Sequence, residues 1–171
     1  MRELILLRHA HAEPAAAGQA DIDRPLSAQG LAEAEAAGRW LAAQGLVPDR
    51  VLCSPARRAR ESLEAVLQAI GYVEQRLEAD IYEATAGSLA ALADANREAE
   101  RLLNVGHNPG LEHLAALLHS RQTGAYRGMP DIAGCGVAWP CCVPAHRCAH
   151  VPRPLIRRIR VSVSSCARAG A

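Results

Sequence analysis

A short apolar run that ends abruptly in two polar residues constrains the fold of this chain more than any other feature. Residues 4–13 read LILLRHAHAE, so four apolar residues precede Arg8 and His9. Such a run is typical of a strand buried on both faces. Open α/β sheets bind ligands at the carboxyl ends of their strands. Arginine grips phosphate and histidine is a nucleophile near neutral pH, so we expect phosphate chemistry at this strand end.

The rest of the first 130 residues alternates between strand and helix patterns. We expect Ser27 to cap a helix that stops at Gly45, and a strand over 51–53. Ser54 is expected to cap a helix that runs to residue 70, after which 81–87 reads as a loop and Ser88 as the cap of the next helix. A strand over 101–105 and a helix opened by 108–110 follow. This order predicts an α/β fold, a three-layer sandwich with a mostly parallel central sheet and helices on both faces.

Polar side chains follow three of the predicted strands. Arg8 and His9 follow the first, Arg57 or Arg58 the second, and His107 the strand over 101–105. Parallel strands bring such junctions to one edge of the sheet, and the free N–H groups at helix N-termini favour an anion. The sequence therefore predicts a phosphate site at this edge.

Four motifs in this order resemble those of the histidine phosphatase superfamily, and specifically the SixA-type phosphohistidine phosphatases. They are RHA (8–10), RPLSAQG (24–30), CSPARRA (53–59) and VGHNP (105–109). The resemblance covers residues 1–130, which we interpret as a histidine phosphatase domain. It implies a phosphoglycerate-mutase-like fold.

The resemblance also implies roles for five residues. His9 would be the nucleophile that forms a covalent phosphohistidine, Arg8 and Arg58 would grip the phosphoryl oxygens, and His107 would complete the pocket. Arg58 fits the family pattern better than Arg57, because it stands four residues after the serine and directly before an alanine. Glu83, in IYEAT, is the candidate general acid or substrate-binding carboxylate, with an ordinary loop carboxylate as the open alternative.

We expect an enzyme that removes phosphate from phosphorylated histidine in a signalling or phosphotransfer protein. Imidazole leaves as a neutral group, so an acid is needed less than for an alkoxide. Two arginines and two histidines can neutralise the transferring group, so no metal or other cofactor is expected. The alternatives are a general phosphomonoesterase acting on small phosphate esters and a non-catalytic phosphate-binding module.

The location predicted from the sequence is the cytoplasm. Glu3 interrupts the N-terminus, and the apolar run is too short for a signal peptide or a membrane span. We therefore expect no membrane partner. No nucleic-acid partner is expected either, because the basic C-terminal stretch has no aromatic residues to stack on bases. The oligomeric state stays open.

Residues 131–171 differ in composition from the rest of the chain. After Asp131 the sequence has no acidic residue, six of the 19 arginines and five of the six cysteines. The irregular spacing of the potential ligands in this stretch argues against a zinc site. These residues are Cys135, Cys141, Cys142, His146, Cys148 and His150. Our preferred hypothesis is a shifted reading frame, which would leave the sheet without an edge strand.

Overall fold

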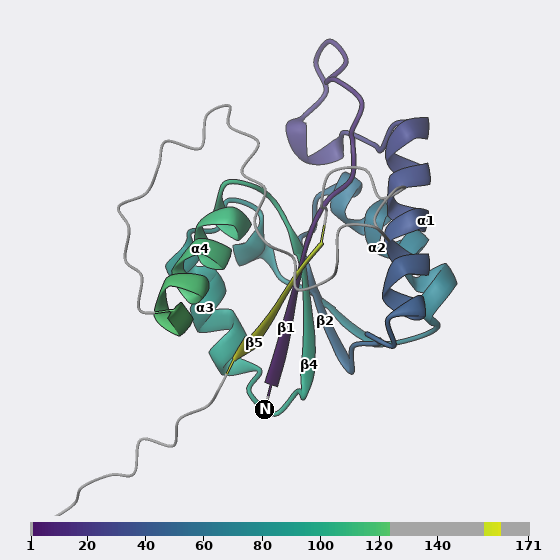
Figure 1. The fold of residues 1–171 in the computed structure, drawn as a ribbon. Coiled ribbons are helices and arrows are strands. Elements are labelled where there is room, and N and C mark those ends of the chain that lie inside the picture. Colours follow the sequence, from purple (N-terminus) through teal and green to yellow (C-terminus); the bar gives the residue numbers. More distant parts are fainter. Residues whose placement is uncertain (1, 124–155, 162–171) are drawn as a thin grey trace, which may run out of the picture.

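The computed structural model describes residues 2–123 and 156–161 (Figure 1). The strands are β1 (Arg2–Arg8), β2 (Arg50–Cys53), β3 (Glu74–Leu77), β4 (Arg101–Gly106) and β5 (Ile156–Val161). The helices are α1 (Ala28–Ala43), α2 (Arg57–Ile70), α3 (Ala86–Ala95) and α4 (Gly110–Thr123). Two short 3₁₀ helices are η1 (Asp21–Asp23) and η2 (Ala79–Ile81).

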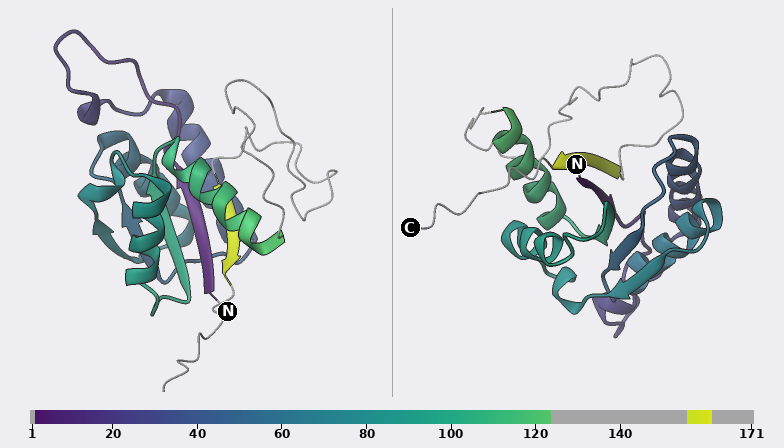
Figure 2. Two further views of the ribbon diagram at one scale, coloured as in Figure 1. Left: turned by 90° about the vertical axis from the view of Figure 1, so that its left-hand side faces the viewer. Right: turned by 90° about the horizontal axis from the view of Figure 1, so that it is seen from below.

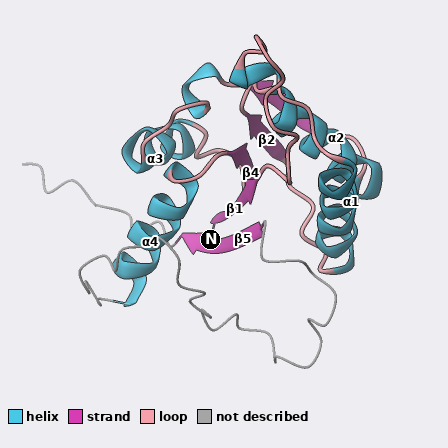
Figure 3. Cartoon of the chain, turned by 90° about the horizontal axis from the view of Figure 1, so that it is seen from above, coloured by secondary structure: helices cyan, strands magenta, loops and turns pink. Residues whose placement is uncertain are grey.

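The strands form one sheet in the order β3-β2-β4-β1-β5. The first four strands in this order run parallel, and β5 pairs antiparallel with β1. Helices α1 and α2 cover one face of the sheet, and α3 and α4 cover the other (Figures 1 and 3). The mostly parallel three-layer sandwich expected from the sequence is therefore confirmed.

The apolar run in β1 supplies both faces of the core. Ile5 and Leu7 pack in the cluster that contains residues of α1 and α2, while Leu4 and Leu6 pack in the cluster that contains residues of α3 and α4. All four side chains are buried. Alternate residues of a strand point to opposite faces, so a strand between two helical layers needs an unbroken apolar sequence. This burial fixes where β1 ends and therefore where Arg8 and His9 emerge.

Two of the predicted helix starts are wrong. Helix α2 begins at Arg57 with Ala56 at its N-cap and no side-chain cap, rather than at Ser54. In α3 the cap is Thr85, whose side chain accepts from the Ser88 backbone N–H while the Ser88 hydroxyl bonds back to Thr85 N. Both serines are thus bonded near a helix start, but the local sequence does not show which hydroxyl reaches the free N–H groups.

Helix α1 begins as predicted. The Ser27 hydroxyl accepts from Gly30 N at 3.0 Å, and His11 Nδ1 lies 2.8 Å from the same hydroxyl. His11 thus contacts the start of α1. Strand β3, which is exposed at the outer edge of the sheet, was not predicted.

The expectation of a missing edge strand is wrong. Strand β5 lies within the unusual C-terminal stretch and pairs with β1 in the register Leu4↔Ile159 (Figure 2). The reading-frame hypothesis itself stays a prediction, which translation of the other frames of the gene would test. The cysteines and histidines considered as zinc ligands lie outside the described residues. In the described part of the chain, every helix is too short or too polar to cross a bilayer.

Candidate active site

Three neighbouring strands bring the predicted site residues to one edge of the sheet. His9 follows β1, Arg58 lies in the first turn of α2 after β2, and His107 follows β4. Because β4 pairs with both β1 and β2, these three ends are adjacent. The rings of His9 and His107 are 5.0 Å apart between centroids, and Arg58 Nε lies 3.3 Å from His9 Nε2. Residues separated by up to 98 positions thus form one cluster.

His9 is held as a neutral imidazole whose unprotonated nitrogen is Nε2. Its Nδ1 lies 2.8 Å from the Ala10 carbonyl oxygen, which can only accept, so Nδ1 carries the proton. Nε2 then accepts from the Arg58 guanidinium. Burial lowers the pKa of His9 to about 4, with the positive charges of Arg58 and Arg8 acting in the same direction. A neutral, oriented imidazole of this kind can attack phosphorus at neutral pH.

Arg58 is buried, and each of its three side-chain nitrogens makes a hydrogen bond. Its Nη1 donates to the backbone carbonyl of Asp21 at 2.6 Å, and its Nη2 donates to the Asp21 carboxylate at 2.9 Å. The guanidinium carbon also lies 5.9 Å from the centre of the Tyr82 ring. A buried arginine held at its outer edge by a carboxylate keeps a fixed orientation. Its Nε is thereby aimed at His9.

Asp21 is bonded to three side chains around this site. Besides Arg58, its carboxylate accepts from the Tyr82 hydroxyl at 2.7 Å and from Arg24 Nη1 at 2.8 Å. The hydrogen bonds from Tyr82 and Arg24 are the main reasons why the pKa of Asp21 lies well below its usual range. The carboxylate is therefore ionised throughout the physiological range. It balances part of the positive charge at the site.

His107 lies between Ser54 and Tyr82. Its Nε2 is 2.7 Å from the Ser54 hydroxyl, and its ring meets Tyr82 edge-on at 5.5 Å between centroids. Burial, followed by the charges of His9 and Arg58, lowers its pKa to about 4. Its Nδ1 is buried and has no hydrogen-bond partner in the described part of the chain.

The remaining two predicted residues lie at the border of this cluster. Arg8 is exposed at the end of β1, and its charge contributes to the lowered pKa of both histidines. Glu83 is exposed and follows Tyr82 in the chain. Within the described residues no hydrogen bond or ion pair joins its carboxylate to His9 or His107. The structure therefore groups His9, Arg58 and His107 closely, and leaves the general-acid role of Glu83 a prediction.

Sequence reasoning missed Asp21 and Tyr82 and misassigned Ser54. Asp21 lies three residues before Arg24 of the RPLSAQG motif, and Tyr82 lies beside Glu83 in IYEAT. Their closeness in sequence to these two motifs is the signal that could have identified both residues. The contact from Asp21 to Arg58 joins parts of the chain 37 residues apart, and no local pattern shows such a pairing.

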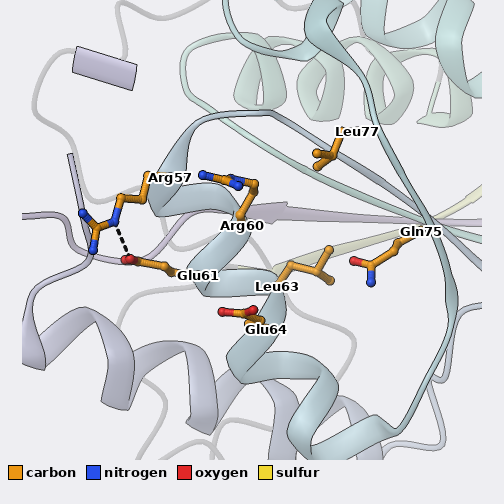
Figure 4. Close-up of a pocket in the computed structure, with 7 residues that line it drawn as sticks. All are labelled: Arg57, Arg60, Glu61, Leu63, Glu64, Gln75 and Leu77. Atoms are coloured by element: carbon orange, nitrogen blue, oxygen red, sulfur yellow. Dashed lines mark hydrogen bonds and ion pairs between the residues drawn. The ribbon is translucent and has the colours of Figure 1, made fainter. Parts of the chain in front are cut away.

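A pocket elsewhere on the molecule does not include this cluster. It lies between α2 and β3 and is lined by Arg57, Arg60, Glu61, Leu63, Glu64, Gln75 and Leu77 (Figure 4). Arg57 makes an ion pair with Glu61 there at 2.7 Å, one helical turn away. Both side chains of this ion pair are partly exposed to solvent. The ion pair also separates Arg57, which faces this pocket, from Arg58, which faces His9.

No group of three or more His, Cys, Asp or Glu side chains that could hold a metal ion occurs within residues 2–123 and 156–161. The polar groups near His9 are mostly cationic or neutral donors, with Asp21 already bonded to three of them. Donors of this kind suit an oxyanion ligand.

Comparison with known proteins agrees with this geometry. The family model of the histidine phosphatase superfamily (branch 1) matches residues 4–125. The chain therefore belongs to the histidine phosphatase superfamily. This family assignment agrees with the phosphatase expected from the sequence.

Curated relatives match part of their own length. An uncharacterized protein of Mycobacterium tuberculosis (strain H37Rv) is 40% identical over 107 residues, which are 60% of this chain and 64% of the relative. An uncharacterized chloroplastic protein of Arabidopsis thaliana is 35% identical over 133 residues, which are 68% of this chain and 59% of the relative. The chain thus spans less than two thirds of the length of these relatives.

Solved structures show the same fold and agree with the SixA resemblance. A protein of Agrobacterium tumefaciens assigned as the phosphohistidine phosphatase SixA is 32% identical, with a TM-score of 0.69, over 71% of this chain and 79% of that one. The protein histidine phosphatase SixA complexed with tungstate is 28% identical, with a TM-score of 0.63, over 68% of this chain and 76% of that one. The similarity to these structures confirms the SixA-type resemblance.

Proposed function

We propose that this chain is a phosphohistidine phosphatase acting on phosphorylated histidine in a signalling or phosphotransfer protein. The observation that carries the proposal is the neutral His9 imidazole, with Nδ1 bonded to the Ala10 carbonyl and Nε2 turned toward buried Arg58. Similarity to SixA-type structures supports the same substrate class, and one of these proteins was solved with tungstate, a tetrahedral oxyanion. Cytoplasmic location stays a prediction from the sequence.

In the proposed reaction, the Nε2 lone pair of His9 attacks the phosphorus atom. The P–N bond of the substrate breaks, and its electron pair goes to the departing nitrogen. The other ring nitrogen of the substrate carries a proton, so the group leaves as neutral imidazole. Water then attacks the phosphorus of the enzyme phosphohistidine, and the P–Nε2 bond breaks with its electron pair returning to Nε2. The protons of the water leave on phosphate or pass to solvent, and His9 returns to its neutral form with the proton on Nδ1. Arg58 and Arg8 would balance the negative charge of the phosphoryl oxygens in both steps.

The direct test is phosphate release from a histidine-phosphorylated protein by the full chain and by His9→Ala. We expect turnover by the wild type, acid-quenched enzyme that carries labelled phosphate, and loss of both in the variant. His113→Ala is the matched control, because it removes an imidazole in α4 outside the cluster around His9. A folded wild-type chain that binds phosphate or vanadate without turnover would instead indicate a phosphate-binding module.

The alternative enzyme, a general phosphomonoesterase, differs in its need for an acid. Esters lose an alkoxide, which general acid catalysis accelerates by roughly 10²-fold or more, whereas imidazole leaves as a neutral group. Glu83→Gln should therefore reduce ester hydrolysis strongly and leave phosphohistidine hydrolysis nearly unchanged. Equal loss with both substrates would favour the monoesterase.

A further inference from the structure

The contact between Ser54 and His107 has a defined direction of hydrogen bonding. The Ser54 side chain is completely buried, and its hydroxyl lies 2.7 Å from His107 Nε2. The same hydroxyl oxygen accepts from the Ala56 backbone N–H at 3.3 Å. A hydroxyl has one proton to donate. Among the described residues, the other hydrogen-bond partner of this hydroxyl is His107 Nε2.

The two neutral tautomers of His107 differ in how they use this contact. With the proton on Nε2, the imidazole donates to Ser54, and the serine proton is left buried without an acceptor among the described residues. With the proton on Nδ1, Ser54 donates to the Nε2 lone pair, and the serine oxygen still accepts from Ala56. Buried polar groups without partners are costly, so this contact favours the second arrangement.

The second arrangement also suits an anionic ligand. His107 Nδ1 is buried and unpartnered in the described residues. The oxygens of an ionised phosphoryl group are acceptors only, so a bare Nδ1 lone pair would repel them, whereas an Nδ1–H group can donate to one. Because the ring is neutral at neutral pH, the choice of tautomer alone decides whether His107 offers this donor.

We propose that Ser54 is a positioning residue that fixes His107 as its Nδ1–H tautomer and so keeps Nδ1–H free to donate to the transferring phosphoryl group. The step from tautomer to catalysis rests on the proposed phosphatase function. The assignment of the His107 tautomer does not depend on that function, and the tautomer can be measured without substrate.

The first measurement is therefore spectroscopic. Long-range ¹H–¹⁵N correlation spectra of the full-length ¹⁵N-labelled chain at neutral pH distinguish a protonated from an unprotonated ring nitrogen, and His107→Gln assigns the signals. We expect a protonated Nδ1 and an unprotonated Nε2. A wild-type His107 with its proton on Nε2 overturns the proposal without any variant of Ser54.

The variants test whether the serine sets the tautomer. In Ser54→Ala we expect a substantial Nε2–H population, and in Ser54→Thr, which keeps a hydroxyl, a return toward Nδ1–H. Ser62→Ala is the matched control, because it removes another buried serine that bonds Ala10 N and the Arg58 carbonyl rather than a ring nitrogen. It should leave the His107 tautomer unchanged. A pure Nδ1–H tautomer in Ser54→Ala contradicts the proposal.

The kinetic consequence is a separate readout. Loss of one correctly placed donor should lower kcat/KM for a phosphohistidine substrate about tenfold in Ser54→Ala, the value of one hydrogen bond. Partial recovery in Ser54→Thr is expected. If the wild type shows the Nδ1–H tautomer but no turnover, the proposed function fails while the structural role of Ser54 stands. If Ser54→Ala changes the tautomer but not the rate, the catalytic part of the proposal is wrong.

Discussion

At the scale of single residues, the positive charge of the site lies on its arginines, while its two histidine rings are uncharged at neutral pH. The arginines carry the charge that an oxyanion needs, and their field combines with burial to keep His9 and His107 neutral. A protonated His9 would have no lone pair with which to attack phosphorus. The site thus surrounds two uncharged rings with positive charge, and the proposed attack by His9 needs no prior loss of a proton.

This arrangement predicts unusual titration of the two rings. NMR titration of the free protein should place the midpoints of His9 and His107 at about 4, compared with an ordinary value of 6.5. Bound vanadate or tungstate should raise both midpoints, because a nearby negative charge favours imidazolium. Histidine-to-glutamine variants assign the signals. Midpoints near the ordinary value in the free protein would contradict the electrostatics described above.

The same shifts affect the free energy of unfolding. Both folded-state pKa values lie below the unfolded value, so the unfolded chain binds more protons as the pH falls from about 6.5 to about 4. The stability that these histidines contribute above pH 6.5 is therefore lost across this window. The decrease in Tm over this range should be smaller in His9→Gln/His107→Gln than in the wild type.

At the scale of elements, close contact between α1 and α2 fixes the helix that carries Arg58. A Cβ atom on Gly38 would lie 2.9 Å from both Val66 Cα and Val66 O, and 3.2 Å from Ala69 Cβ. The first two of these atoms belong to the backbone, which cannot move aside cheaply. Glycine at this position therefore determines how near the two helices approach and where α2 presents Arg58.

Gly38→Ala should reduce the free energy of unfolding by about 1–3 kcal/mol, as expected for overpacking a buried contact. Gly87→Ala is the matched control. In α3 its Cβ meets only Thr85 Oγ1 at an ordinary 3.7 Å, so the substitution should be neutral or stabilise by up to about 1 kcal/mol. Urea denaturation of both variants measures the difference. A Gly38→Ala protein as stable as the wild type would show that the helices separate easily.

Elements with strong local patterns could be predicted from the sequence, and contacts between distant segments could not. The apolar run of β1 and the Ser27 cap of α1 were recognisable, because each depends on neighbouring residues. Strand β3 was not, since its four residues are exposed and mostly polar. Ser54 carried a correct local signal for a helix start, yet its hydroxyl contacts a histidine 53 residues away. The contact with His107 takes the place of the helix-capping role that the local sequence would otherwise assign to Ser54.

At the scale of the whole molecule, β5 covers the outer edge of β1. It pairs with β1 over six positions, from Arg2↔Val161 to Leu7↔Ile156. Without this partner, the N–H and C=O groups along that edge of β1 would be unpaired, and such an edge invites association between copies. The strand that leads into His9 would then be paired on its β4 side only.

Two truncated chains test this role of β5. A chain ending at residue 161 keeps β5, and a chain ending at residue 155 lacks it, so the difference between them reports the pairing alone. We expect a lower Tm and larger species in size-exclusion chromatography for the shorter chain. Identical behaviour of the two would mean that the pairing with β1 contributes little.

The position of His107 late in the described fold also matters while the protein is being made. His9 and Arg58 belong to the first half of the chain. His107, the second ring of the cluster, follows β4, which lies between β1 and β2 in the sheet. A nascent chain that has emerged from the ribosome only as far as α2 contains His9, the proposed nucleophile, but lacks the central strand of the sheet. The proposed phosphate chemistry would therefore have to await synthesis past residue 107, since only then are both rings of the cluster present.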